Sequence, residues 1–408
     1  MKTESFDVII VGAGPGGCAC ALTLAASGLR IALVEKDTFP RDKTCGDALS
    51  PDVVNQLGML PDGVKARFEA SADKIGIHGV RIYSPDAACL EISFTRKHAE
   101  QPFGYLMKRW EFDHLFFEQV KTLDNVTIFE NCKARQVAGT EEAITIVTED
   151  RAFEAKIVVG ADGAHSILAR HAGVKVENPH YCAGLRVYYD KVDGLHDKQH
   201  IELHFYDDLL PGYFWIFPLP NNQANVGIGM ISSELKKKKV RLKSKLQEII
   251  HEHPNVAPRF RQARQRGKVE GFGLPLGSKK RRISGERFVL VGDAASLIDP
   301  LTGEGIGNAM RSGRIAAAHL LNCFEQQDFS ASFNQGYDAA LYRMMWRELK
   351  FSRFLQKSFR SPSLFNFLAK RFSRSRSLEA LLTYVMEEEI TYKVIHASVP
   401  RLLGFSKQ

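Results

Sequence analysis

The sequence predicts an α/β protein of two or three domains: a parallel sheet covered by helices, a second sheet inserted into it, and a helical C-terminal segment. Its 408 residues are 44% hydrophobic and 25% charged, an ordinary globular composition. Three observations support this class. A strand, a glycine-rich turn, a helix and a second strand occupy residues 6–35. Two later apolar strands end in acidic turns, and an aromatic strand alternates over residues 213–217.

The first segment has the pattern of a dinucleotide-binding turn. Residues 6–11 (FDVIIV) are a β-branched run typical of a buried parallel strand, and a helix of small residues follows. The glycines of the G-x-G-x-x-G pattern are Gly12, Gly14 and Gly17. In this pattern they allow, in order, a tight turn, close approach of a pyrophosphate, and close packing of helix on strand. The sequence therefore predicts a Rossmann-type site with the pyrophosphate on the helix N-terminus.

The second strand, residues 30–34, ends at Glu35. Glu35 lies about twenty residues after Gly12, where an acidic residue accepts hydrogen bonds from the adenosine ribose hydroxyls. Its carboxylate argues against a 2′-phosphate in this site, because two anions would face each other. The segment by itself leaves NAD and FAD equally open.

Two further apolar strands end in acidic turns. They are residues 157–163 (IVVGADG) and residues 287–295 (RFVLVGDAA). A carboxylate at the carboxyl end of a parallel strand faces the crevice where such sheets bind ligands. Residues 299–307 (DPLTGEGIG) then open a helix expected to reach about Leu321, and their bare amides could contact a planar ring.

The order of these three motifs resembles the FAD-dependent flavoproteins built like p-hydroxybenzoate hydroxylase. The resemblance implies that FAD is the cofactor, that Asp293 binds the ribityl chain and that Asp162, with Gly163, closes the dinucleotide site. It also implies an FAD contact from Arg109. The residues expected to hold the cofactor are Gly12, Gly14, Gly17, Glu35, Arg109, Asp162, Asp293, Gly303, Gly305 and Ile306.

Three segments resemble the geranylgeranyl reductase family within this superfamily. Ser296 stands after Gly-Asp-Ala-Ala, where the hydroxylases usually carry His, and residues 292–306 (GDAASLIDPLTGEGI) instead resemble the geranylgeranyl reductases. Residues 43–51 (KTCGDALSP) resemble the family's Cys-Gly segment beside the flavin, and residues 213–218 (YFWIFP) with 227–229 (GIG) resemble its Tyr-x-Trp-x-Phe-Pro…Gly-x-Gly signature. The resemblance covers residues 6 to about 330. It implies an FAD-dependent oxidoreductase that reduces carbon–carbon double bonds of an isoprenoid or similar apolar lipid by hydride transfer from reduced FAD.

The aromatic strand is the candidate substrate site. Tyr213, Trp215 and Phe217 alternate, so their side chains lie on one face of a strand. Gly227 and Gly229 interrupt the next strand, and glycines in a strand mark close approach by a ligand or another backbone. The pair of strands predicts a flat apolar slot that suits a prenyl chain and equally a planar aromatic substrate. The alternative is that the three aromatic side chains only pack in the core and that the two glycines form β-bulges.

Cys45 is the candidate catalytic residue. Beside the flavin, its thiol could position or protonate the substrate, and a half-buried structural thiol is the equal alternative. The seven cysteines include no Cys-x-x-Cys pair and the histidines show no metal spacing, so we expect no metal site and a reducing, cytoplasmic compartment.

Two other function classes stay open. One is an oxygen-using flavin monooxygenase or halogenase acting on an aromatic substrate, although Tyr213 replaces the first Trp of the halogenase Trp-x-Trp-x-Ile-Pro pattern. The other is a flavin-bearing scaffold without turnover. No second G-x-G-x-x-G motif is present, so we expect reduction of the flavin by transiently bound NAD(P)H or by a protein electron donor.

The formal net charge of +8 is concentrated outside the cofactor motifs. Residues 236–245 and 341–378 carry much of it, and no nucleic-acid-binding motif accompanies them. On a helical wheel the basic arc holds Arg343, Arg347, Lys350, Arg353 and Lys357, together with Trp346 and Phe354, and the opposite arc holds Leu341, Met344, Met345 and Leu355. The pattern suits an anionic membrane surface, which would make the protein peripheral at the inner membrane face, or a helix packed on the cofactor domain. The basic residues could instead bind the diphosphate group of a prenyl substrate.

The expected layout is discontinuous. A Rossmann-type FAD-binding domain would comprise residues 1–75, 104–180 and 272–330. An inserted antiparallel-sheet substrate domain would comprise residues 76–103 and 181–271. Residues 331–408 would form a C-terminal helical region with a further helix at 379–390, and no segment has the pattern of a signal peptide or a membrane span.

Overall fold

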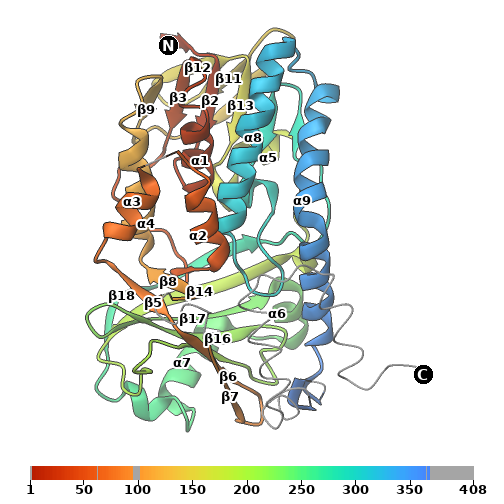
Figure 1. The fold of residues 1–408 in the computed structure, drawn as a ribbon. Helices are drawn as coiled ribbons and strands as arrows, with labels where there is room; N and C mark the ends of the chain where they lie inside the picture. Colours follow the sequence, from red (N-terminus) through yellow and green to blue (C-terminus); the bar gives the residue numbers. More distant parts are fainter. Residues whose placement is uncertain (1, 62, 95–101, 364, 368–408) are drawn as a thin grey trace, which may run out of the picture.

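The computed structural model describes residues 2–61, 63–94, 102–363 and 365–367, and it divides into a cofactor half and a substrate half (Figure 1). The cofactor half is built on a six-stranded sheet in the order β19-β20-β13-β2-β3-β9. Its strands are β2 (Val8–Val11), β3 (Ile31–Val34), β9 (Val126–Phe129), β13 (Ile157–Gly160), β19 (Ser284–Gly285) and β20 (Phe288–Leu290). All neighbours run parallel except β19 and β20. The central strands β2, β3 and β13 are wholly buried, as a parallel sheet covered on both faces requires.

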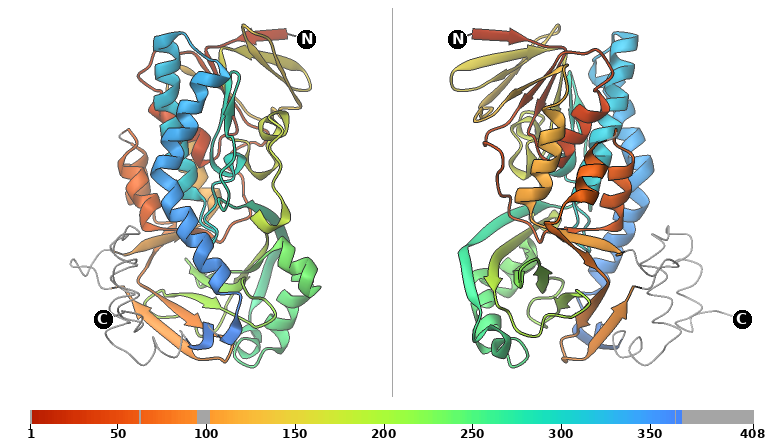
Figure 2. Two further views of the ribbon diagram at one scale, coloured as in Figure 1. Left: turned by 90° about the vertical axis from the view of Figure 1, so that its right-hand side faces the viewer. Right: turned by 60° about the vertical axis from the view of Figure 1, so that its left-hand side comes forward.

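Helices cover this sheet. They are α1 (Pro15–Thr23), α2 (Pro51–Gly58), α3 (Val64–Ala70), α4 (Arg109–Val120), α5 (Ile167–His171), α8 (Ile306–Gln326) and α9 (Ala331–Ser358). Short 3₁₀ turns occur at Gly163–His165, Asn178–His180, Ala257–Phe260 and Gly292–Ala295. Helix α1 packs between α4 and α8, and α8 packs against α9 (Figure 2). Within the described residues, every helix is too short or too polar to cross a bilayer.

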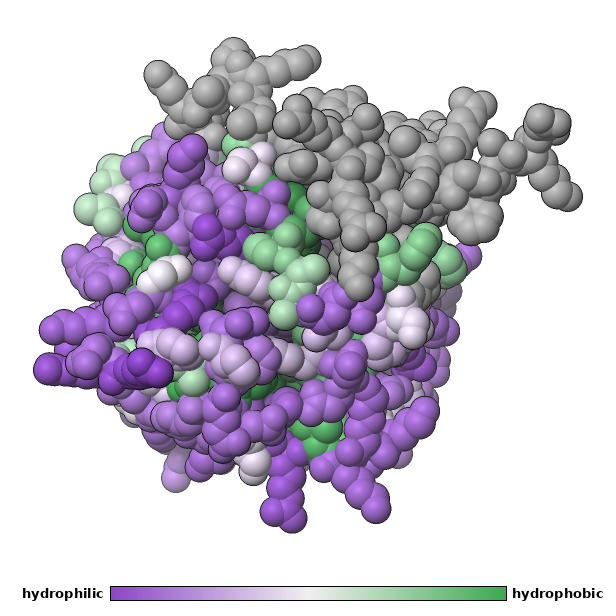
Figure 3. All heavy atoms as spheres, turned by 90° about the horizontal axis from the view of Figure 1, so that it is seen from below, coloured by the Kyte–Doolittle hydropathy of each residue, from purple (hydrophilic) through white to green (hydrophobic). Residues whose placement is uncertain are grey.

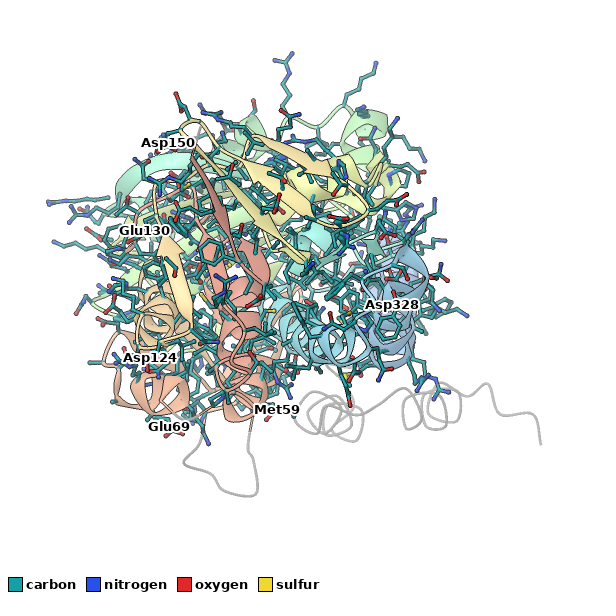
Figure 4. The ribbon with its side chains drawn as sticks, turned by 90° about the horizontal axis from the view of Figure 1, so that it is seen from above. Met59, Glu69, Asp124, Glu130, Asp150 and Asp328 are labelled. Atoms are coloured by element: carbon teal, nitrogen blue, oxygen red, sulfur yellow. The ribbon has the colours of Figure 1, made fainter. Side chains whose placement is uncertain are left out.

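A four-stranded sheet closes the outer end of the cofactor half. It has the order β1-β12-β11-β10, with β1 (Lys2–Ser5), β10 (Gln136–Gly139), β11 (Ile144–Val147) and β12 (Arg151–Ala155). Figure 4 looks onto this end of the molecule. The acidic side chains labelled there lie at separate points around the rim: Glu69, Asp124, Glu130, Asp150 and Asp328. They therefore do not form one acidic patch.

The substrate half is a seven-stranded sheet in the order β18-β14-β17-β16-β15-β6-β7. Its strands are β6 (Gly79–Tyr83), β7 (Cys89–Ser93), β14 (Tyr181–Asp190), β15 (Ile201–His204), β16 (Tyr213–Leu219), β17 (Gln223–Ile231) and β18 (Arg264–Pro275). The expected antiparallel sheet is in fact mixed, because β6 pairs with β15 in parallel. This pairing joins two stretches of chain that lie about a hundred residues apart, which a local pattern does not reveal. The domain limits remain a prediction.

Two further groups complete the substrate half. Helices α6 (Ser232–Lys238) and α7 (Leu242–Glu252) follow β17, and α7 packs on the sheet through Leu246, Ile249 and Ile250. A small sheet of β4 (Ala48–Leu49), β8 (Gly104–Met107) and β5 (Lys74–Ile77) lies where the two halves meet.

Helix α9 runs along the cofactor half and reaches the substrate half (Figure 2). Leu341, Met345 and Leu349 are buried in the core of the cofactor half, so this part of the tail is a helix packed on that half, with basic residues on its outer face. The prediction that Met344 lies on the apolar face is wrong, because its side chain is 58% exposed. The expected helix at 379–390 lies outside the described residues.

We predict that Gly313→Ala destabilises the fold. A Cβ on Gly313 in α8 would lie 2.2 Å from the Gly16 carbonyl oxygen, so α1 and α8 would have to separate, at a cost of about 1–3 kcal/mol or more. Gly336→Ala in α9 is the matched control, since its Cβ would meet only the His319 ring at 3.7 Å and helix propensity should add about 0.5–1 kcal/mol. Thermal unfolding of both variants measures the difference. Equal shifts in melting temperature would contradict the packing argument.

Candidate active site

One cavity of about 1690 Å³ lies between the cofactor and substrate halves. Small-molecule sites usually measure about 300–1,000 Å³, so this cavity has room for two molecules side by side. The predicted residues that line it are Gly12, Gly14, Glu35, Cys45, Arg109, Asp162, Tyr213, Trp215, Phe217, Gly229, Asp293, Gly303, Gly305 and Ile306. The structure thus brings together the predicted cofactor motifs, the candidate cysteine and the aromatic strand.

The glycines of the first turn have different surroundings. A Cβ on Gly12, whose φ is +104°, would lie 2.4 Å from the Ala161 carbonyl oxygen, and a Cβ on Gly17 would lie 1.9 Å from that of Gly12. Packing therefore requires both. A Cβ on Gly14 would meet only the Arg41 Nη2 atom, at 3.8 Å. Gly14 precedes α1 without a side-chain cap, so the helix amides are free to bind a phosphate.

Glu35 is buried at the end of β3. One carboxylate oxygen, Oε2, accepts a 2.7 Å hydrogen bond from the Ala13 amide, and the other, Oε1, accepts a 3.0 Å bond from the Asp37 amide. These two bonds fix the carboxylate against the glycine-rich turn. Each oxygen keeps a second lone pair that can accept from a ribose hydroxyl.

Asp162 and Asp293 follow β13 and β20. Asp162 Oδ2 accepts a 2.7 Å hydrogen bond from the Ile167 amide, while its Oδ1 is buried and has no hydrogen-bond partner among the described residues. Burial raises the pKa of Asp162. A buried acceptor without a donor is rare, and a bound hydroxyl or amide would satisfy it, so this atom fits a dinucleotide. Asp293 Oδ2 lies 3.7 Å from Lys43 Nζ.

The second glycine-rich turn begins α8. Gly303 has a φ of +76°, and Gly305 precedes the helix without a side-chain cap. Both α1 and α8 therefore present free N-terminal amides to the same cavity. Two helix dipoles oriented in this way stabilise negative charge on a bound pyrophosphate or flavin ring.

Arg109 belongs to a buried ion-pair triad. Its Nε and Nη2 atoms each donate a 2.6 Å hydrogen bond to the Asp113 carboxylate, and Arg41 Nη1 donates a 2.7 Å bond to the same group. Burial alone would lower the pKa of Arg109, but Asp113 more than offsets it and raises the pKa. The triad carries a net positive charge, which lies beside Gly14 and suits a pyrophosphate.

Cys45 is held in place by Asn225, a buried residue of β17. The Asn225 amide nitrogen donates 2.8 Å hydrogen bonds to the Cys45 carbonyl and to Asp47 Oδ2, and its oxygen accepts a 2.9 Å bond from the Trp215 indole. Burial raises the pKa of Asp47 to about 6, against the effect of hydrogen bonds from Tyr188 and Asn225. The arrangement fixes the Cys45 backbone relative to the aromatic strand. The Cys45 thiol also interacts with Arg109.

Tyr213, Trp215 and Phe217 form the aromatic wall. Their ring centroids lie 6.0 and 6.1 Å apart along β16, and the Tyr213 hydroxyl donates a 2.5 Å hydrogen bond to the Thr302 carbonyl in the second glycine-rich turn. Gly227 lies behind the Trp215 ring, since a Cβ there would be 2.1 Å from Trp215 Cζ2. Its role is to make room for the indole. Apolar side chains from β6, β15, β17 and α9 also line the cavity: Val80, Ile82, Ile201, Leu203, Ile231, Met345 and Leu349.

These features define a flavoprotein of the FAD-binding class. The family model described as "FAD binding domain" matches residues 5–332. The match confirms FAD as the cofactor, and it agrees with the orphaned Asp162 oxygen and the free helix N-termini.

The relatives identify the family within this class. A digeranylgeranylglycerophospholipid reductase of Methanocella arvoryzae is 32% identical over 86% of this chain and 86% of that protein. A menaquinone reductase of Mycobacterium tuberculosis is 30% identical over 78% of this chain and 77% of that protein. The chain belongs to the geranylgeranyl reductase family of FAD-dependent oxidoreductases.

The comparison with solved structures agrees with this family assignment. A geranylgeranyl bacteriochlorophyll reductase-like protein from Thermoplasma acidophilum superposes with a TM-score of 0.80 at 25% identity, covering 97% of this chain and 99% of that chain. The halogenase PltM superposes with a TM-score of 0.71 at 17% identity, covering 93% and 86%, and that likeness shows the fold alone. The findings confirm the predicted fold class and the reductase function over the halogenase or monooxygenase alternative.

Three residues at the site are not among those predicted from the sequence: Arg41, Asn225 and Glu304. Asn225 could have been found as a buried amide in the apolar part of a strand that begins with Gln223. Arg41 and Glu304 carry no comparable signal, because their contacts to Asp113 and Ser50 come from distant segments.

We predict a pH dependence of stability from Glu304. Burial raises its pKa to about 7, with Asp52 adding to the effect, while a hydrogen bond from Ser50 opposes it. Between pH 4.5, its ordinary pKa, and about 7, the folded state holds a proton that the unfolded chain has lost. The free energy of unfolding should therefore fall as pH rises through this window and stay lower above it.

Glu304→Gln removes this titration. We expect the variant to be more stable than the parent at pH 8 and to lose that advantage at pH 4.5. Thermal unfolding of both proteins at several pH values measures the difference. A stability difference that does not change with pH would show that Glu304 is ionised throughout.

Proposed function

We propose that this protein reduces carbon–carbon double bonds in the prenyl chain of a lipid. The observation that carries the proposal is the continuity of the cavity: the cofactor turns, Cys45, the aromatic wall and an aliphatic extension form one lining. The apolar part of this lining suits a flexible hydrocarbon chain. The names of the relatives, which include digeranylgeranylglycerophospholipid reductases, support the same substrate class.

FAD, when bound and reduced, supplies a hydride to one carbon of the double bond. Tyr213, Trp215 and Phe217 would hold the chain flat and exclude water from it. The Cys45 thiol would give its proton to the other carbon, and its S–H bond would break as the new C–H bond forms. The Arg109 guanidinium beside Cys45 would stabilise the resulting thiolate until a solvent proton restores the thiol.

The residues that would hold the cofactor follow from the site. The α1 amides, Gly14 and Arg41 would bind the pyrophosphate, and Glu35 the adenosine ribose. Asp162 and Asp293 would accept from the ribityl and flavin groups, and the turn around Gly305 would contact the ring. We infer that transiently bound NAD(P)H or a protein donor reduces the flavin.

We further propose that the protein works at an anionic membrane surface from the cytoplasmic side. Arg343, Arg347, Lys350 and Lys357 are exposed on the outer face of α9. The uncovered part of the face seen from below is mainly hydrophilic, with smaller apolar areas between (Figure 3). The exposed cations on α9 favour contact through charge with anionic lipid headgroups.

We predict that the holoenzyme, reduced with dithionite under anaerobic conditions, saturates a geranylgeranyl-bearing glycerophospholipid. Mass spectrometry should show the addition of two hydrogen atoms for each double bond reduced. Cys45→Ala should slow this reaction about 10²-fold or more, since it removes the proton donor while FAD stays bound.

Cys182→Ala is the matched control, because Cys182 lines the same cavity. It should react at the parental rate. The proposal fails if the reduced protein saturates no prenyl lipid anaerobically yet hydroxylates an aromatic compound in air. Equal rates for both cysteine variants would remove Cys45 from the mechanism without affecting the substrate class.

A further inference from the structure

The edge of the substrate sheet has a polar back face opposite the cavity. On β15, Ile201 and Leu203 line the cavity, so Glu202 and His204 point to the other side, as does His200 just before the strand. On β6, Val80 and Ile82 line the cavity and Arg81 points away. The back face of the cavity wall therefore carries titratable side chains that the proposed reaction does not use.

Three of the side chains at this edge converge: Glu91, His196 and His200. Glu91 is on the edge strand β7, whereas His196 and His200 lie in the segment before β15. Glu91 Oε1 is 3.3 Å from His196 Nε2 and 3.7 Å from His200 Nδ1, and the three ligand atoms lie within 4.8 Å of one another. The two imidazole rings stack with centroids 3.7 Å apart and an interplanar angle of 12°.

The two distances from Glu91 to the histidines match the edges of a zinc coordination tetrahedron. Zn–N and Zn–O bonds of about 2.0–2.2 Å at tetrahedral angles place neighbouring ligand atoms about 3.4 Å apart. The separations of 3.3 and 3.7 Å fit these edges, but each nitrogen lone pair lies in the plane of its ring. The His196 ring must therefore rotate out of its stack with His200 before both nitrogens can face one ion. Magnesium and calcium prefer all-oxygen sites, whereas two imidazoles and one carboxylate suit zinc.

His200 supplies an independent observation. Its side chain is completely buried, yet neither ring nitrogen hydrogen bonds to any part of the chain that the structure describes. A Cβ on Gly79 would lie 2.4 Å from His200 Nε2, so the glycine provides the space for this ring. A buried polar group without a partner is costly, and a metal ion on Nδ1 would satisfy one of the two ring nitrogens.

Arg81 orients the carboxylate. Its Nε atom donates a 2.8 Å hydrogen bond to Glu91 Oε2, which leaves Oε1 directed toward the two histidines. Groups that hold a metal ligand from behind in this way fix its geometry and raise the affinity of the site. Arg81 contacts Oε2, the carboxylate oxygen that faces away from the histidines, and the carboxylate partly neutralises its positive charge.

We propose that Glu91, His196 and His200 bind a zinc ion, with water as the fourth ligand. The ion clamps the edge strand β7 to the segment before β15, across the intervening β6. The front of these strands lines the apolar part of the cavity, so the clamp braces that wall. The site is independent of the proposed function.

The experiment uses the tag-free, FAD-loaded full chain, dialysed against zinc chloride after treatment with a chelator. Bound zinc is measured by elemental analysis, and thermal unfolding is followed with and without the metal. Glu91→Gln and His196→Ala test the site, since both side chains reach the surface of the fold. His200 is left unchanged, because truncation of a buried ring destabilises the protein regardless of metal.

We expect one zinc ion per chain in the parent and a melting temperature that rises with zinc. Both variants should bind zinc at least about tenfold more weakly and show no such rise. His251→Ala is the matched control: His251 lies exposed on α7, bonded to Gln247, and its loss should change nothing. Cobalt in place of zinc should give the visible absorption of a tetrahedral site in the parent and in the control.

The proposal is overturned if the parent binds no zinc above the level of Glu91→Gln. It is also overturned if Glu91→Gln and His196→Ala bind zinc as tightly as the parent. Unchanged FAD content in every protein shows that the variants are folded, so a loss of zinc can be assigned to the site.

Discussion

The hydrogen bonds of one buried carboxamide join the two halves of the active site. Asn225, on β17 of the substrate sheet, binds the Cys45 carbonyl and Asp47 on one side and the Trp215 indole on the other. The same Asp47 accepts from the Tyr188 hydroxyl. A displacement of this group would move the thiol and the aromatic wall relative to each other, so the geometry of the proposed reaction depends on it.

The lining of the cavity combines a charged part from the cofactor half with an apolar part. The charged part includes two uncapped helix N-termini, Arg41 and the Arg109–Asp113 pair, which together favour an anionic dinucleotide. The apolar part includes the aromatic wall and aliphatic side chains from several strands and from α9. FAD and a prenyl chain have the matching properties, and Cys45 lines the same cavity. The zinc site proposed on the back of this wall would stiffen its outer edge.

Much of the fold and of the cofactor site could be predicted because the signals are local. Gly12, Gly14 and Gly17 have a fixed spacing between a strand and a helix, and the structure has the same strand, turn and helix. The alternation of Tyr213, Trp215 and Phe217 predicted that their side chains share one face of a strand. What could not be predicted depends on tertiary contacts. Asn225, Arg41 and the parallel β6–β15 pair join distant segments, and the burial of α9 on one face left Met344 exposed. His196 and His200 gave no signal, because their partner Glu91 lies about a hundred residues earlier.

The central claim is tested most directly by the rate at which a geranylgeranyl lipid reoxidises the reduced holoenzyme without oxygen, compared between the parent and Asn225→Ala. Gln223→Ala, on the same strand, is the control. The account predicts a rate about 10²-fold lower for Asn225→Ala in protein that retains its FAD, and an unchanged rate for the control. An unchanged rate in FAD-loaded Asn225→Ala would contradict the claim that this residue positions Cys45 against the substrate wall.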